Sequence, residues 1–596
     1  MKDIYSNFHS FDKAGQDRLK QAEWLTGSEI LLRSLLLEGV DCVFGYPGGA
    51  VLYIYDAMHG NKSFNHVLTR HEQGAIHAAD GYARSTGRTG VCLATSGPGA
   101  TNLVTGIATA YMDSVPLVVI TGNVPSDQIG TDAFQEADIV GITMPITKHS
   151  FFVRDAGDIA RTVREAFYIA GTGRKGPVLI DIPKDVSASR ALYEYPEQLQ
   201  LPGYRLLPDP SDGQIDAIMD LLSGALRPVI LAGGGIVHAD ASSELIAFAE
   251  KASIPVVTTL MGLGGFPSSH PCWIGMPGMH GTVAANRALV ETDCLICLGA
   301  RFDDRVTMRL DGFAPNAAVI HVDIDAAELG KIVPAKLKLA ADAKAVLTLL
   351  NKRNIDRRRY EPWLQCLRQL REAEPLRYDD RDPAALKPQF VIETICETTG
   401  GRAIVTTDVG QHQMWTAQFY SFTYPRSFIT SGGLGTMGFG LPSAIGAQIA
   451  NPDALVVSVN GDGGIQMCAQ ELAICSIHRI PVKIVILNNR TLGMIRQWQE
   501  VIYEGRHSHI DLSGSPDFVK LAEAYGIKGL RADNKADAVR IWHEALAHPG
   551  PVLLDFWIDP DELVLPMIQV GSTLSDMLTM RDMDLKHNER SSRHEQ

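Results

Sequence analysis

The chain lacks the features that would place it in several common protein classes. It has only nine cysteines in 596 residues and no run of about 18 or more apolar residues, so we expect neither a disulfide-stabilised domain nor a membrane-spanning helix. It contains no Lys/Arg-rich block, and its net charge of -14 argues against a nucleic-acid partner. Residues 1–20 mix acids with bases and have no apolar core, which fits neither a secretory signal nor a transit peptide. We therefore expect a cytoplasmic protein whose partners are small molecules, with no nucleic acid and no membrane.

The cysteines lie scattered in apolar contexts. The only close pair, Cys294 and Cys297 in DCLICLGA, lies on a segment with the pattern of a buried strand. A redox-active or metal-binding pair with this spacing would need an exposed turn or a helix start. We therefore predict that all nine cysteines are reduced core residues.

The composition is that of a globular protein, and the chain repeats itself. Hydrophobic residues make up 45% and charged residues 20%, which predicts large buried cores and roughly two to four domains. Residues 97–116 and 461–481 each run from a glycine-containing turn through a helical pattern to a strand that begins near a proline. The segments GPVLIDIPKD (176–185) and GPVLLDFWID (550–559) then close the two halves in a similar way. This similarity predicts two domains of one architecture with a third domain between them.

The intervening region, about residues 209–350, contains strands that end in glycines or acids. RPVILAGGG (227–235) runs into three glycines, whereas CLICLGARFDDR (294–305) and AVIHVDIDAAELG (318–330) lead into aspartates. Acids just beyond strand ends hold ribose hydroxyls in many doubly wound folds, so the pattern is compatible with a dinucleotide site. GGG is not the GxGxxG fingerprint, and by itself it is a weak signal.

The most informative stretch is residues 456–499. An apolar run leads into Gly461-Asp462-Gly463-Gly464, a helix is expected over 466–478, and a second apolar run at 482–487 meets Asn488-Asn489. In such a βαβ unit both turns lie at the carboxyl ends of neighbouring parallel strands, so we expect Asp462 and Asn489 to face one another. A carboxylate and an amide oxygen suit Mg²⁺, and the glycines and the helix start favour a phosphate. GDG alone is equally typical of a tight turn.

A second candidate is Glu72, which follows the extended segment before RHEQGA. The next residues have a helical pattern, so the glutamate is predicted at a helix N-terminus. Taken alone, it is better explained as an ordinary acid of a first helical turn, favoured by the helix dipole.

The motifs in order resemble a known family. They are GYPGGA, RHEQGA, SGPGATNLVT, IGTDAFQE, ITKHS, GMHGTV, RFDDRV, TTDVGQHQMW, GGLGTMGFGLP, GDGG, LNN and GMIRQWQE. Together they are similar to the catalytic large subunits of acetohydroxyacid synthase, also called acetolactate synthase, over residues 26 to about 576. The resemblance implies an α/β fold of three doubly wound parallel-sheet domains: pyrimidine-binding (22–190), FAD-binding (209–350) and diphosphate-binding (388–570), with a linker at 351–387 and a tail at 571–596.

The reaction implied by this resemblance is decarboxylation of pyruvate on thiamine diphosphate (ThDP), followed by transfer of the hydroxyethyl group to pyruvate or 2-ketobutyrate in branched-chain amino-acid biosynthesis. Mg²⁺ and a structural, non-redox FAD are the other implied cofactors. The implied partners are a second copy, as a homodimer or a dimer of dimers, and a small regulatory subunit.

Roles near the reacting centre also follow from the resemblance. Glu72 is expected to hydrogen-bond the pyrimidine ring, and Met437 is expected to support the cofactor in a bent shape. Six residues are expected to serve catalysis or substrate binding, the cations by attracting 2-keto-acid carboxylates and Trp498 by favouring 2-ketobutyrate: Glu72, Gln135, Lys148, Arg305, Met494 and Trp498.

The expected cofactor contacts form three sets. ThDP is expected to contact Pro47, Gly48, Val409, Gly410, Gln411, His412, Gly435, Met437, Gly461, Asp462, Gly463, Gly464, Asn489 and Gly493. The metal is expected on Asp462, Asn489 and the carbonyl oxygen of Thr491. FAD is expected to contact Arg174, Gly233, Gly234, Gly235, Met279, His280, Arg301, Asp303, Asp304, Arg305, Asp323 and Asp342.

The sequence departs from the family pattern in few places, and alternatives remain. Pro277 stands where the family usually has leucine, which could adjust the flavin site, and IQVGSTLSD is a variant C-terminal stretch. The nearest alternatives are a flavin-using pyruvate oxidase and a glyoxylate carboligase, although Glu72 argues against the carboligase. A catalytically inactive nucleotide-binding protein is an alternative of another class.

Overall fold

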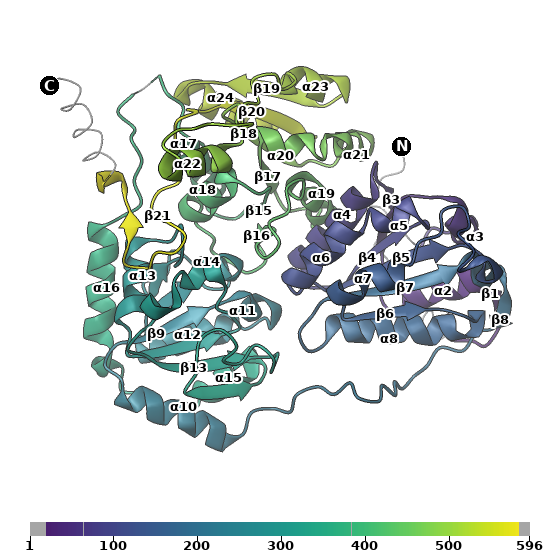
Figure 1. Ribbon diagram of the computed structural model, residues 1–596, viewed down its shortest axis with the longest axis horizontal. Helices are drawn as coiled ribbons and strands as arrows, with labels where there is room; N and C mark the ends of the chain where they lie inside the picture. The colour runs from purple at the N-terminus through teal and green to yellow at the C-terminus, as the bar shows by residue number, and fades with distance from the viewer. Residues whose placement is uncertain (1–18, 64, 383, 583–596) are drawn as a thin grey trace.

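The computed structural model describes residues 19–63, 65–382 and 384–582, which form three α/β domains. In Figure 1 the N-terminal domain (purple to blue) lies to the right, the middle domain (teal) lower left and the C-terminal domain (green) at the top. Each domain contains a six-stranded sheet in which every pairing is parallel, so the predicted fold class is confirmed. Within these described residues, no helix is both long and apolar enough to cross a membrane.

The N-terminal sheet has the order β3-β2-β4-β5-β7-β6. Its strands are β2 (Cys42–Gly45), β3 (Asn65–Leu68), β4 (Gly90–Ala94), β5 (Leu117–Asn123), β6 (His149–Phe152) and β7 (Pro177–Pro183). The helices are α2 (Gly27–Leu37), α3 (Leu52–Met58), α4 (Glu72–Thr86), α5 (Pro98–Thr101), α6 (Val104–Met112), α7 (Ile139–Thr143), α8 (Ile159–Gly171) and α9 (Lys184–Ala188). A separate antiparallel pair joins β1 (Trp24–Thr26) to β8 (Arg190–Leu192). Thr26 and Glu29 cap α2 reciprocally, which fixes where this first helix begins.

The middle sheet has the order β11-β10-β9-β12-β13-β14, and the chain reverses direction across the sheet between β9 and β12. Its strands are β9 (Pro228–Ala232), β10 (Val256–Thr258), β11 (Trp273–Gly275), β12 (Cys294–Leu298), β13 (Ala318–Asp323) and β14 (Leu337–Ala340). The helices are α10 (Asp212–Gly224), α11 (Gly234–His238), α12 (Ser242–Ala252), α13 (Val283–Glu291), α14 (Asp304–Thr307) and α15 (Ala343–Leu350). Numbered within the domain, this is the 3-2-1-4-5-6 order of dinucleotide-binding folds, whose ligands bind where the order reverses.

The C-terminal sheet has the order β16-β15-β17-β18-β20-β19. Its strands are β15 (Ile404–Thr407), β16 (Phe428–Ile429), β17 (Val456–Gly461), β18 (Lys483–Asn488), β19 (Lys528–Ala532) and β20 (Val552–Trp557). The helices are α17 (Pro388–Thr399), α18 (Gln411–Phe419), α19 (Gly440–Ala450), α20 (Asp462–Gln466), α21 (Leu472–His478), α22 (Gly493–Ile502), α23 (Phe518–Ala524) and α24 (Lys535–Ala547). When the strands of each sheet are counted in chain order, the C-terminal sheet and the N-terminal sheet have the same strand order. The predicted repetition is therefore confirmed.

One predicted helix is wrong in its extent. Residues 466–478 do not form a single helix: α20 begins at Asp462 and ends at Gln466, and α21 covers Leu472–His478 after a 3-10 turn. The interruption lies at Cys468, whose backbone angles (φ -139°, ψ 15°) lie outside the α-helical region and therefore cannot continue an α-helix. Asp462 is therefore the first residue of α20.

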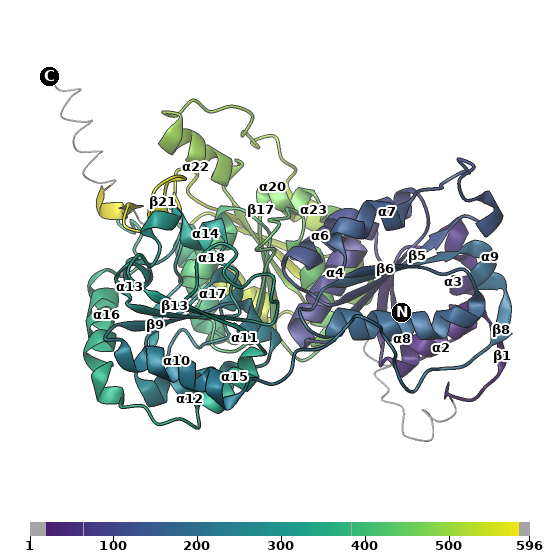
Figure 2. The same ribbon diagram turned by 60° about the horizontal axis from the view of Figure 1, so that its bottom comes forward.

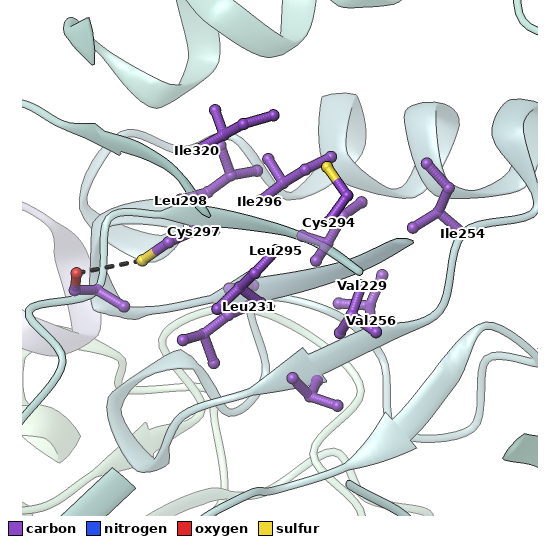
Figure 3. Close-up of a cluster of buried hydrophobic side chains, with 14 of the residues drawn as sticks. Val229, Leu231, Ile254, Val256, Cys294, Leu295, Ile296, Cys297, Leu298 and Ile320 are labelled. Atoms are coloured by element: carbon purple, nitrogen blue, oxygen red, sulfur yellow. Dashed lines mark hydrogen bonds between the residues drawn. The ribbon is translucent and has the colours of Figure 1, made fainter. Parts of the chain in front are cut away.

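The prediction that all the cysteines lie in the core needs one correction. Cys294 and Cys297 lie on β12 among apolar side chains of the neighbouring strands, as Figure 3 shows, and the Cys297 thiol donates to the carbonyl oxygen of Ala300. All nine cysteines are free, and seven of them are buried. Cys366, however, is exposed, because it lies on the solvent side of an amphipathic helix, α16 (Glu361–Ala373).

The N-terminal and C-terminal domains pack through α4 and α19, which lie side by side in Figure 1. Glycines allow the two backbones to touch. A Cβ on Gly81 would lie 2.0 Å from the carbonyl oxygen of Ser443, and a Cβ on Gly446 would lie 1.8 Å from that of Ala78. Side chains of both helices join a single core, so the first turn of α4 is held in a fixed position against the C-terminal domain.

Segments outside the three sheets pack mainly on the middle domain. Helix α16 lies within the predicted linker 351–387, and its Trp363 and Leu367 join the middle core. Beyond the C-terminal sheet, β21 (Met567–Ile568) and β22 (Met577–Leu578) form a hairpin beside the same domain in both views (Figures 1 and 2), with Leu574 buried there. Residues 571–582 of the predicted tail are therefore packed, whereas the polar end after residue 584 lies outside the described residues.

Candidate active site

Glu72 is the first residue of α4, as predicted, and lies at the carboxyl edge of the N-terminal sheet. Asn102 Nδ2 donates a hydrogen bond to Glu72 Oε2 at 2.9 Å. The turn just before it is held from the C-terminal domain, where both carboxylate oxygens of Glu471 accept from the backbone N–H of Arg70, at 3.1 and 3.2 Å. Glu471 itself is buried, and burial raises its pKa to about 7. The position of Glu72 thus depends on two domains.

Other predicted residues share this edge. A Cβ on Gly48, which follows Pro47, would lie 2.4 Å from the side chain of Thr95, directly after β4. Gln135 has a left-handed backbone (φ 61°), and its carbonyl oxygen lies 2.8 Å from the position of a Cβ on Gly97. The structure therefore brings Gly48 and Gln135 to the carboxyl edge that carries Glu72.

Lys148 lies elsewhere. Its backbone N–H donates to the carbonyl oxygen of Pro177 at 2.8 Å, at the amino end of β7, and its ammonium donates to the carbonyl oxygens of Ile169 and Thr172 at the end of α8. Burial lowers the pKa of this ammonium to about 8. Because all strands of the sheet are parallel, Lys148 occupies the edge opposite Glu72, and the structure does not bring the two together.

The lysine that does lie at the carboxyl edge is Lys184. It follows β7 directly and begins α9, where it lines a hollow with Tyr53 and Pro125. The motif IPKD places this cation just past a strand end, which is the signal that could have identified it from the sequence.

The carboxyl edge of the C-terminal sheet gathers the other predicted residues. A Cβ on Gly461 would lie 2.9 Å from the ring of His412, and a Cβ on Gly463 would lie 3.7 Å from Met437 Cε. A Cβ on Gly493 would lie 2.0 Å from Gln411 Oε1 and 2.5 Å from Asn489 Nδ2. The turns after β15, β17 and β18 thus converge with the loop before α19, which brings together Val409, Gly410, Gln411, His412, Gly435, Met437, Gly461, Asp462, Gly463, Gly464, Asn489, Thr491 and Gly493.

Asp462 is the charged centre of this edge. Its side chain is 2% exposed, and Oδ2 has no hydrogen-bond partner among the described residues. Burial, with the nearby charge of Asp555 as a smaller cause, raises its pKa to about 7. A buried carboxylate without a partner is costly, and a cation would relieve that cost.

The donors around Asp462 fit Mg²⁺. The described residues contain no group of three or more His, Cys, Asp or Glu side chains that could hold a metal, so a cation here would rely on one carboxylate and neutral oxygens. Asn489, on the turn after the neighbouring strand β18, has an amide oxygen that accepts from Thr491 N–H at 3.3 Å. Mg²⁺ commonly takes few protein ligands and completes its shell with water and phosphate oxygens.

His412 and Asp408 lie beside the turns at this edge of the sheet, His412 next to Gly461 and Asp408 next to Gly438. Burial lowers the pKa of His412 to about 3, so its ring is neutral, and Nε2 has no partner among the described residues. Asp408 is fully buried and accepts from the backbone N–H groups of Gly438 at 3.0 Å and Gly440 at 3.3 Å, which fixes the loop that carries Met437. Asp408 was not predicted, although an acid directly after β15 is the same strand-end signal that identified Asp462.

Helix α22 begins at this edge with Gly493 and carries Met494 and Trp498, both half-buried. Gln497, between them in the sequence, is completely buried. No sequence signal identifies it, because a glutamine on an amphipathic helix normally lies on the solvent side.

The middle domain has a cavity of about 280 Å³ at the point where its strand order reverses. The predicted flavin residues that line it are Arg174, Gly234, Gly235, Arg301, Asp303, Asp323 and Asp342. Arg174 reaches across from the N-terminal domain and pairs with Asp325 at 3.0 Å and Glu328 at 2.8 Å. Burial raises the pKa of Asp323 to about 6. The shape and strand order suit a dinucleotide.

Five predicted flavin residues do not line this cavity, namely Gly233, Met279, His280, Asp304 and Arg305. Two of them, Met279 and His280, contact C-terminal parts of the chain, and the Met279 carbonyl oxygen accepts from the N–H of Ile568 at 2.9 Å. Met279 N–H donates to the Arg305 carbonyl oxygen at 2.8 Å, and the His280 carbonyl oxygen accepts from Gln418 at 2.9 Å. The Arg305 side chain is largely exposed, and its guanidinium lies 3.5 Å from the exposed carboxylate of Asp304.

Comparison with known proteins agrees with this geometry. Three models of thiamine pyrophosphate enzymes match: the N-terminal TPP binding domain over residues 25–142, the central domain over 215–350 and the C-terminal TPP binding domain over 408–556. The chain is 50% identical over 567 residues to the acetolactate synthase large subunit IlvB1 of Mycobacterium tuberculosis, covering 94% of this chain and 92% of that protein. It is 48% identical to the acetolactate synthase large subunit of Lactococcus lactis (95% and 98% covered) and 47% identical to that of Haemophilus influenzae (94% and 99% covered).

Each matched region lies within one of the three sheet domains, although the N-terminal match ends before β6 and β7, and the C-terminal TPP binding domain contains the turns after β15, β17 and β18. Identity near one half over almost the whole length of each relative leaves no domain of this chain unmatched. The chain is therefore a thiamine-diphosphate-dependent enzyme that belongs to the family of acetolactate synthase large subunits.

Proposed function

We propose that this chain is an acetolactate synthase, which decarboxylates pyruvate and joins the two-carbon unit to a second 2-keto acid. The products are 2-acetolactate from pyruvate and 2-aceto-2-hydroxybutyrate from 2-ketobutyrate, as needed for valine, leucine and isoleucine synthesis. The observation that carries the proposal is the site itself. A buried Asp462 with one unpaired carboxylate oxygen and the amide oxygen of Asn489 share one edge, in a chain about half identical to named acetolactate synthases over 94% of its length.

Thiamine diphosphate, when bound, supplies the carbon that attacks pyruvate and holds the electron pair released with CO2. Asp462, Asn489 and the carbonyl of Thr491 would hold Mg²⁺. Gln411, a neutral His412 and the backbone N–H groups at the start of α20 would hold the diphosphate, because a helix N-terminus favours an anion.

We assign to Glu72 the role of sharing a proton with a nitrogen of the pyrimidine ring. Its Oε2 is oriented by Asn102, and the first turn of α4 is fixed by Glu471. A carboxylate held in this way can share a proton with a ring nitrogen and so favour the tautomer that removes the proton from the reactive carbon. Met437, on the loop that Asp408 fixes, is assigned the support of the bent cofactor.

The substrate side requires cations for two 2-keto-acid carboxylates. At the N-terminal edge we assign this role to Lys184 together with Gln135, because both lie on the side of Glu72. Arg305 is the candidate from the middle domain, since its guanidinium is exposed. Met494 and Trp498 on α22 would form the wall against the second substrate.

The cavity of the middle domain is assigned to FAD, with Asp323 as the candidate partner for ribose hydroxyls and Arg301 as a candidate partner for the pyrophosphate. The overall reaction moves no net electrons, so the flavin would be structural. The flanking Arg174 would then anchor the N-terminal domain against the cofactor.

The assembly assigned to the chain is a homodimer or a dimer of dimers with a small regulatory subunit, because the relatives are named large subunits. Exposed apolar side chains near the carboxyl edges of the N-terminal and C-terminal sheets support contact between copies. Phe134, beside Gln135, is 88% exposed, and Met467, near Gly438, is 59% exposed. We assign the domains to residues 22–190, 209–350 and 388–570 and the protein to the cytoplasm.

Product analysis tests the proposal directly. The purified chain with ThDP, Mg²⁺ and FAD should convert pyruvate to acetolactate, and added 2-ketobutyrate should give acetohydroxybutyrate. Formation of acetyl phosphate with consumption of oxygen would instead identify a pyruvate oxidase, and no CO2 release from pyruvate would exclude both.

A further inference from the structure

A chain of buried side-chain amides connects the turn after β18 to α22 and to the segment after β20. Asn489 Nδ2 donates to Gln411 Oε1 at 3.1 Å, and Gln411 Nε2 donates to Gln497 Oε1 at 2.9 Å. Gln497 Nε2 donates to the carbonyl oxygen of Val564 at 3.0 Å, and Gln497 Oε1 accepts from the N–H of Val564 at 2.8 Å. Gln497 and Val564 are 0% exposed, so water does not compete for these bonds.

The direction of this amide chain is fixed by backbone groups. A side-chain amide can turn over and exchange its oxygen and nitrogen, but a backbone N–H can only donate and a carbonyl can only accept. Val564 offers both groups, so the oxygen of Gln497 must face its N–H. Gln411 then faces two acceptors, Gln497 Oε1 and the carbonyl oxygen of Glu562 at 3.2 Å, and must present Nε2 to them. Its oxygen is left for Asn489, which must therefore present Nδ2.

The direction of the amide chain determines which atom of Asn489 is left to bind a metal. With Nδ2 committed to Gln411, the oxygen of Asn489 faces the other way, where it accepts from the N–H of Thr491 at 3.3 Å, on the turn assigned to the metal. An amide nitrogen has no lone pair to offer a hard cation, whereas the oxygen does. We propose that Gln497 is a positioning residue of the metal site, because through Gln411 it orients the amide of Asn489 with its oxygen toward Mg²⁺. This inference rests on the metal site assigned under the proposed function.

Two further observations show that the amide chain is built into the fold. Glu562 is held by Lys387 at 2.6 Å and by Gln389 at 2.8 Å, so its carbonyl oxygen is a fixed anchor. At the other end, a Cβ on Gly493 would overlap both Gln411 and Asn489, so α22 can begin here only with a glycine. The same contacts that orient Asn489 therefore also fix the helix that carries Trp498.

Calorimetric titration of the full chain with Mg²⁺ at saturating ThDP tests the proposal. Gln497→Met removes the acceptor and the donors and should raise the Mg²⁺ dissociation constant about tenfold or more, since buried partners are left unpaired. Gln497→Glu should stay within about threefold, because burial favours its neutral form, which keeps one acceptor and one donor. Gln499→Met is the matched control on the same helix, since the Gln499 side chain hydrogen-bonds Ser508 of the following loop rather than Gln411 or Val564, and it should leave the constant unchanged.

Hydrogen exchange gives a second readout. The amide of Val564 should exchange faster in Gln497→Met than in the wild type. If Gln497→Met lowers the melting temperature but binds Mg²⁺ within twofold of wild type, Gln497 only stabilises the fold and the proposal is overturned. If that variant does not fold, Gln497→Asn replaces it, because the shorter amide cannot reach both partners. Its dissociation constant should rise at least fivefold, and an unchanged value overturns the proposal.

These measurements are independent of the reaction product. A wild-type chain that binds Mg²⁺ in a Gln497-dependent way but forms no acetolactate would refute the proposed function and leave this inference standing. A chain that forms acetolactate and whose Gln497→Met variant binds Mg²⁺ normally would refute the inference alone.

Discussion

Gly493→Ala is the substitution whose effect the structure defines most sharply. Alanine in place of a helical glycine ordinarily stabilises by about 1 kcal/mol. Here the new Cβ would lie 2.0 Å from Gln411 Oε1, about 1.4 Å (3.4 − 2.0) inside an ordinary contact, and 2.5 Å from Asn489 Nδ2. Both side chains must move, which breaks the 3.1 Å hydrogen bond between them. Overpacking costs about 1–3 kcal/mol, and an unpaired buried amide costs a further 1–3 kcal/mol or so.

The expected result is a ThDP- and Mg²⁺-binding defect rather than a folding defect. A loss of about 2 kcal/mol in the free energy of Mg²⁺ binding corresponds to a Mg²⁺ dissociation constant raised roughly thirtyfold. Mg²⁺ titration at saturating ThDP measures this constant. Gly213→Ala is the matched control, because Gly213 lies in the first turn of α10 with nothing within 4 Å of its added Cβ. It should bind normally and melt at the same or a higher temperature. If Gly493→Ala binds Mg²⁺ within twofold of wild type, the close approach described above is not maintained in solution.

Three further predictions concern the reaction. Glu72→Gln should keep its fold and its flavin but lose most activity, because an amide cannot stabilise the protonated pyrimidine as a carboxylate does; activity within a few-fold of wild type would remove Glu72 from that role. Trp498→Leu should shift product from acetohydroxybutyrate toward acetolactate in mixed-substrate assays, since selection of one methylene is worth about 1–3 kcal/mol, and an unchanged product ratio would contradict its assignment. Pyruvate added without oxygen should leave the visible flavin absorption largely intact during turnover, whereas rapid stoichiometric bleaching would indicate an oxidase.

The fold and the metal-site turns could be predicted because their determinants are local. Apolar runs of strand length followed by GDGG or NN specify both a strand and the polar group at its carboxyl end, so the positions of Asp462 and Asn489 follow once the strands are parallel. The repetition of β7 and β20 in GPVLIDIPKD and GPVLLDFWID likewise reflects one strand position used in two sheets. The local sequence pattern was sufficient to predict the position of a residue wherever that residue's neighbour in space lies on the next strand.

Prediction failed where the neighbour is distant in sequence. Lys148 precedes a short edge strand, and only the packing of α8 decides that its ammonium lies at the amino edge. Gln497 binds Val564, 67 residues later, so its burial has no local signal. The break at Cys468 depends on backbone angles that the helical pattern of 466–478 does not encode. In each case the deciding contact joins segments that no sequence periodicity connects.

The last prediction concerns which chains form one site. By resemblance to the family, the carboxyl edge with Glu72 faces the edge with Asp462 of a partner chain, and a symmetric dimer then has two equal sites. Subunits carrying Glu72→Ala and subunits carrying Asp462→Ala should each be inactive. When dimers exchange, half should be mixed, and each mixed dimer should have one doubly damaged and one intact site, so activity should rise to roughly a quarter of wild type. If verified mixed dimers stay inactive while both parents fold and bind FAD, the site lies within one chain. The exposed Phe134 and Met467 would then need another explanation.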